Sequence, residues 1–163
     1  MVDWPASTRL HVGHRLKTDT SPPGLEPASV WRRFAAFCYD LLLLAALTVI
    51  FTLAVLAFRR GAAVPPGTWW FPAALLGVAA AFFSGFWARG GQTVGMRAWR
   101  IRVVREDGGP LGAPRAVARF GAGLLALLPA GLGLWWGVFD AEKRGWHDRM
   151  TGTRVVRVLM PRR

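Results

Sequence analysis

An arginine and an aspartate stand seven residues apart at the start of the first long apolar run of this 163-residue chain. The stretch WRRFAAFCYD places Arg33 ahead of the run and Asp40 inside it. Seven residues at 100° each bring both side chains to one helix face, about 10.5 Å apart along the axis. A charged carboxylate inside a membrane helix costs roughly 2.5–3.5 kcal/mol, so Asp40 should face protein or water. Two roles stay open for it: an ionisable group that carries a proton or ion, or a polar anchor to Arg33 or another basic residue.

The stretch FDAEKRGWHDRM near the C-terminus holds a second set of titratable side chains. Asp140 and Asp148 flank a basic turn, and His147 has a side chain that ordinarily titrates near neutral pH. A His-Asp pair is typical of metal-dependent phosphohydrolases, but this sequence lacks their further ligands, so no metal site is expected. We expect Asp148 to accept backbone N–H groups or to pair with an arginine of residues 89–119. Since no nucleophile–base pair or cofactor loop can be assembled, neither an enzyme nor a cofactor is expected.

The composition indicates the elements that position these residues. Hydrophobic residues make up 53% of the chain, which has nine tryptophans and a net charge of +12. Apolar and basic residues separate into blocks, which is typical of a membrane protein with basic loops. The arginines flank the apolar blocks instead of forming one face, which argues against nucleic acid as the partner.

The predicted fold is an all-α membrane protein with a small cytoplasmic two-stranded β element. Residues 34–58 and 69–88 are predicted to be transmembrane helices, because each can cross a hydrocarbon core of about 30 Å. Residues 118–139 form a third membrane-embedded block, broken by Pro129 and nearby glycines. The expected organisation is a disordered N-terminal tail over 1–30, a membrane domain over 31–157 and a basic C-terminal end over 158–163.

The path of the third block decides the topology. Residues 100–104 and 153–158 both alternate like strands and can pair only if they lie on the same side of the membrane. A re-entrant third block permits that pairing and puts nearly all of the 21 Lys and Arg residues on one side. Three straight spans would separate the strands. The positive-inside rule therefore favours the re-entrant path and a cytoplasmic N-terminus.

Small residues recur every four positions along the second span and could let another helix approach closely. Alanine-rich spans also produce such stripes by chance. The stripe predicts packing against a second copy of the chain or another membrane protein. It consists of Ala73, Gly77, Ala81 and Gly85.

Three stretches taken together resemble the RDD family of small bacterial membrane proteins. They are the arginine and aspartate of the first span, GQTVGMRAWRIRVVREDGGPLG after the second span, and RGWHDRMTGTRVV near the end. The resemblance covers about residues 31–157 and implies that Arg33 and Asp40 are the family's arginine and first aspartate. Asp148 is favoured over Asp140 as the second aspartate because of its His-Asp-x-x-x-Gly-Thr context, and Arg119 resembles a common family arginine.

The family has no settled molecular function, and the resemblance implies a multi-pass protein of the bacterial cell membrane. Transport of ions or small solutes, such as cation/proton exchange with Asp40 as the intramembrane ionisable group, is one hypothesis. The alternative is a non-catalytic membrane scaffold or assembly factor. Its basic cytoplasmic face would bind anionic lipid headgroups or a partner protein.

Overall fold

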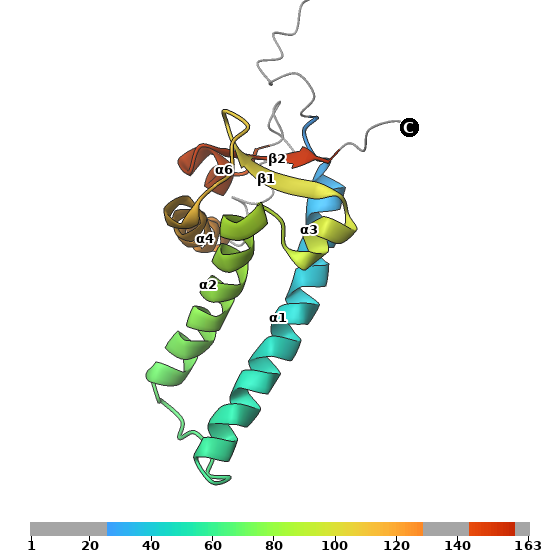
Figure 1. Cartoon of the computed structure of the whole chain (residues 1–163). Helices are drawn as coiled ribbons and strands as arrows, with labels where there is room; N and C mark the ends of the chain where they lie inside the picture. The colour runs from blue at the N-terminus through green and yellow to red at the C-terminus, as the bar shows by residue number, and fades with distance from the viewer. Residues whose placement is uncertain (1–25, 129–143, 159–163) are drawn as a thin grey trace, which may run out of the picture.

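The computed structural model describes residues 26–128 and 144–158 (Figure 1). Two long helices stand side by side and carry a small layer of short helices and strands at one end. The elements in chain order are α1 (Val30–Phe58), α2 (Trp70–Gly90), α3 (Val94–Ala98), β1 (Ile101–Arg105), α4 (Ala113–Leu127), α6 (Trp146–Met150) and β2 (Thr153–Arg157). We call α3, β1, α6 and β2 together the cap.

Helices α1 and α2 are both long and apolar enough to cross a membrane, as the sequence predicts. Helix α1 begins at Val30, and its N-terminal part lies beside the cap (Figure 1), with Arg33 bound to α6 and Asp40 bound to α3. Residues 41–58 contain no charged side chain and extend about 27 Å at 1.5 Å per residue, which matches a hydrocarbon core. Asp40 therefore lies where the cap meets the apolar part of α1, and not at the centre of a span.

The two predicted strands pair as an antiparallel sheet, with Val103 opposite Val155. Residues 26–28, which were expected in the N-terminal tail, continue the pairing along β2: Ala28 donates its N–H to the Val155 carbonyl at 3.0 Å. Alternate strand residues face inward because side chains alternate across a strand. The core of the cap is made of Ala28, Ala36, Ile101, Val103, Leu111 and Val155.

Helix α4 begins at Ala113, five residues before the predicted start of the third membrane block. Pro114 occupies its first turn, where its missing N–H leaves no hydrogen bond unmade. The helix crosses α2 steeply, since Figure 1 shows it nearly end-on while α2 runs in the plane of the picture.

Residues 129–139 lie outside the described part of the chain, so the predicted embedded block is not confirmed. The prediction that residues 1–25 are disordered is untested.

Candidate functional site

Asp148 is the centre of a buried ionic cluster that joins α1, α4 and α6. Its side chain is fully buried, and its carboxylate meets Arg33 Nη1 at 2.8 Å and Arg119 Nη2 at 2.6 Å. The Gly145 N–H also donates to Asp148 Oδ2 at 3.1 Å, so the carboxylate caps its own helix. The prediction that Asp148 accepts a backbone N–H or pairs with an arginine of residues 89–119 is therefore confirmed in both parts. Arg33 is a third partner, which the sequence had offered as one possible partner of Asp40.

The two arginines connect Asp148 to the sheet. Arg33 Nη2 donates to the Val155 carbonyl at 3.3 Å, and Arg119 Nη1 donates to the Thr153 hydroxyl. The Arg119 guanidinium also lies 5.2 Å from the centre of the Trp87 ring, a cation–π contact with the end of α2. One cluster thus fastens β2 to both long helices.

Electrostatics in the cluster follow from its burial and its excess of arginine. Burial alone would raise the pKa of the Asp148 carboxyl, but the charges of Arg119, His147 and Arg33 hold it well below its usual range. His147 Nε2 lies 3.5 Å from Asp148 Oδ1. Burial, with the nearby charge of Arg119, lowers the pKa of His147 to about 4. The expectation that His147 titrates near neutral pH is thus wrong, because its side chain is buried and two arginines lie near it.

Asp40 belongs to a second, separate cluster. The Gly95 N–H donates to Asp40 Oδ1 at 2.8 Å, and the Thr93 hydroxyl donates to Asp40 Oδ2. The Thr93 hydroxyl also accepts the Met96 N–H at 3.2 Å as the N-cap of α3. Asp40 is only 2% exposed, which confirms that it faces protein and not lipid. The sequence predicted a polar anchor to Arg33 or another basic residue, but in the structure the hydroxyl of Thr93 and the N–H of Gly95 anchor Asp40 to α3.

Close packing explains why the second residue of α3, Gly95, is glycine. A Cβ on Gly95 would lie 2.2 Å from the Ala36 carbonyl oxygen and 3.0 Å from the Asp40 carboxylate. Only glycine lets the backbone of α3 lie directly against α1. The sequence alone did not connect the stretch GQTVGM, residues 91–96, with Asp40. The signal was present in the threonine, a preferred N-cap residue.

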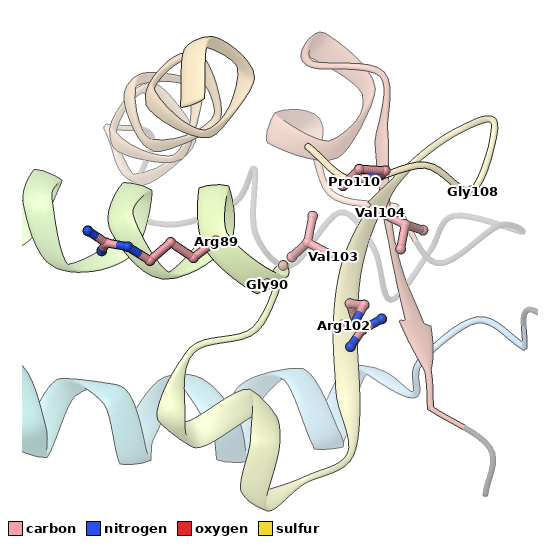
Figure 2. Close-up of a pocket in the computed structure, with 8 residues that line it drawn as sticks. Arg89, Gly90, Arg102, Val103, Val104, Gly108 and Pro110 are labelled. Atoms are coloured by element: carbon pink, nitrogen blue, oxygen red, sulfur yellow. The ribbon is translucent and has the colours of Figure 1, made fainter. Parts of the chain in front are cut away.

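A cavity of about 330 Å³ lies between the end of α2, β1 and the loop after β1 (Figure 2). Arg89 extends back along α2, with its guanidinium beside Gly85 and away from Val103, whereas Arg102 projects from β1. None of the residues that line the cavity is acidic. Within the described residues, neither arginine forms an ion pair, although Arg102 lies 3.5 Å from the Gln92 amide oxygen. With Arg102 in its lining and no acidic residue there, the cavity suits an anionic group better than a cation.

The other predicted residues lie apart from these clusters. Ala73, Gly77 and Ala81 are exposed along α2, so the small-residue stripe faces away from α1 and α4 over most of its length. Asp140 lies outside the described residues. In the part of the chain that the structure describes, no group of three His, Cys, Asp or Glu side chains could hold a metal ion.

Comparison with known proteins agrees with the motif. The sequence pattern of the RDD family matches residues 27–152, most of the chain, a range that includes Arg33, Asp40, Arg119 and Asp148. No curated protein and no solved structure matches the chain.

Proposed function

The chain belongs to the RDD family, and from that premise we propose that it is a non-catalytic scaffold of the bacterial cell membrane. Its motif residues hold a basic cap on two spans, and the cap binds anionic lipid headgroups. The observation that carries the proposal is that both motif carboxylates are already occupied by groups of the chain itself. Asp148 binds Arg33, Arg119 and the Gly145 N–H, while Asp40 binds Thr93 and Gly95.

Such saturation supports a structural role for the motif. A carboxylate that relays a proton or cation must lose and regain a ligand in each cycle, whereas Asp40 accepts hydrogen bonds on both oxygens. Removing either donor would leave a buried polar group unsatisfied, at a cost of about 1–3 kcal/mol. We take Asp148, and not Asp140, as the second motif aspartate, because it pairs with Arg33.

The cavity beside Arg89 and Arg102 is where we place the headgroup. It lies at the end of α2, where an apolar span leaves the hydrocarbon and phosphates begin. Basic residues near a membrane surface contribute about 1 kcal/mol each to the binding of anionic lipid. The positive-inside rule puts this end, and with it the N-terminus, in the cytoplasm. A second copy of the chain could pack along the small-residue stripe of α2.

Lipid retention tests the scaffold proposal. The purified protein would be exchanged into micelles with equal phosphatidylglycerol and phosphatidylcholine, and the lipid that stays bound would be measured by mass spectrometry. We expect the wild type to retain phosphatidylglycerol in excess over phosphatidylcholine. In Arg89→Gln/Arg102→Gln the affinity for phosphatidylglycerol should fall about 30-fold, because each arginine contributes about 1 kcal/mol. Arg59→Gln/Arg60→Gln, at the other end of the spans, is the matched control. Equal loss in both variants, or no lipid preference, would rule the headgroup site out.

Transport is the second candidate, and the burial of Asp40 on a spanning helix is the observation that favours it. A flux assay separates it from the scaffold. The protein would be reconstituted in sealed liposomes with a pH-sensitive dye, and Na⁺, K⁺ or Li⁺ added across a preset pH gradient. The scaffold predicts no cation-dependent proton movement in the wild type. Movement that is lost in a folded Asp40→Asn variant would establish transport instead.

A further inference from the structure

Helix α4 packs across α2 at a defined depth below the cap. The Ser84 hydroxyl donates to the Ala116 carbonyl at 3.4 Å, and the rings of Phe83 and Phe120 stack 6.2 Å apart. Ser84 and Phe83 precede Gly90, the last residue of α2, by six and seven residues, or about 9 and 10.5 Å along the helix axis. If α2 spans the membrane to its end, α4 crosses it about that far inside the surface.

The two sides of α4 differ in what covers them. Ala116, Arg119, Ala122 and Ala126 are buried against the rest of the protein. Val117, Leu124 and Leu128 are exposed by 59%, 36% and 79%. The last two follow Val117 by seven and eleven residues, so at 100° per residue all three fall within about 20° of one line along the helix. That line is opposite the buried side, and no charged residue lies on it.

A transverse helix at this depth meets the boundary between headgroups and acyl chains. Interfacial helices bury their apolar faces about 5–10 Å into that boundary, which agrees with the depth set by Ser84. The charges of α4 also fit this environment. Its sequence holds two arginines and no acidic residue, and Arg115 is exposed in the first turn, where lipid phosphates could bind it.

We propose that α4 is an interfacial helix that lies in the plane of the membrane, with the line of Val117, Leu124 and Leu128 in the acyl chains. Its opposite side holds Arg119 toward Asp148, so the same helix joins the lipid to the buried ionic cluster. The occupant of the apolar face is the bilayer itself, because α2, which α4 crosses, continues into it. This inference does not depend on whether the protein is a scaffold or a transporter.

Site-directed spin labelling measures the depth directly. Cys38 is the only cysteine of the chain and would be replaced by serine, after which Val117, Leu124 and Leu128 would be changed to cysteine one at a time. Each labelled protein would be reconstituted in liposomes, and collision rates with oxygen and with a nickel chelate would give the depth of the nitroxide. Labels at Ile50, exposed on the apolar part of α1, and at Arg97, exposed on α3, would calibrate the hydrocarbon and the water.

The three labels should share one shallow depth and collide more with oxygen than with nickel. A helix that crosses the membrane would instead separate Val117 from Leu124 by about 10.5 Å in depth, and from Leu128 by about 16.5 Å. Such a gradient would overturn the proposal. High nickel rates at all three positions would place the face in water, and low rates with both reagents would show that protein covers it; either result would also overturn the proposal.

Discussion

Replacing Asp148 with asparagine tests the cluster most directly, because the change keeps the shape of the side chain and removes its charge. The variant leaves Arg33 and Arg119 without their shared carboxylate. Arg119 is only 2% exposed and cannot turn to water, so its charge stays uncompensated in the protein interior. Removing one partner of a buried ion pair typically costs about 3–5 kcal/mol. We expect Asp148→Asn to lose stability in that range.

The matched control is Asp107→Asn. Asp107 pairs with Arg105 at 2.5 Å, but its side chain is 55% exposed, so water and salt screen the pair. Exposed pairs of this kind contribute about 0–1 kcal/mol. Denaturation in detergent micelles, followed by tryptophan fluorescence, would compare the two variants with the wild type. Hydrogen exchange of the β2 amides would show whether the loss begins at the sheet, since both arginines bind β2.

A double variant checks the cause of the loss. Adding Arg119→Met to Asp148→Asn removes one of the two stranded charges, so the double variant should lose less stability than the sum of the single variants. Coupling between contacting residues is typically about 0.5–3 kcal/mol. Additive losses, or equal losses in Asp148→Asn and Asp107→Asn, would refute the argument that buried charge pairing holds the cap on the helices.

Two further predictions concern packing and pH. Gly95→Ala should destabilise the protein by about 1–3 kcal/mol in the same assay, because the new Cβ would overlap the Ala36 carbonyl. The control is Gly90→Ala, whose Cβ would meet nothing within 4 Å and should change the stability by less than about 1 kcal/mol. Equal effects of the two substitutions would contradict the packing argument. In the folded protein His147 stays neutral down to pH about 4, whereas the unfolded chain takes up a proton near pH 6.5. The unfolded state therefore binds more protons between these two pH values, so the stability should fall by up to about 3 kcal/mol from pH 6.5 to 4. In His147→Gln the stability should change less with pH over this range. An unchanged pH dependence would show that another group causes it.

The spans and the sheet could be predicted from the sequence because their signals are local. Residues 41–58 have no charged side chain, and the alternation at 100–104 and 153–158 requires only that strands on one side of the membrane meet. The third block was harder to predict. An apolar run does not show whether its helix crosses the membrane or lies in its plane, and that distinction depends on the contact of α4 with Ser84 and Phe83.

The partners of the motif residues could not be predicted, because they depend on how far α1 rises into the cap. Helical spacing correctly puts Arg33 and Asp40 on one face, which suggested that they pair. In the structure, α1 continues beyond its apolar part into the cap. Arg33 therefore contacts α6 and β2, whereas Asp40 contacts α3. Thr93 and Gly95 could therefore not be identified as partners of Asp40 from the sequence, because they meet it only once α3 lies against α1.

The seven-residue spacing of the motif acquires a physical reason from this arrangement. Arg33 and Asp40 are two attachment points on one face of α1, about 10.5 Å apart along the helix axis. Each binds a segment from a different part of the chain. Asp40 holds the segment that leads into β1, while Arg33 holds β2 and the helix before it. Since β1 and β2 pair with each other, these two attachment points hold one sheet at two places. A sheet of two short strands is marginal by itself, and these buried polar contacts give it a rigid support.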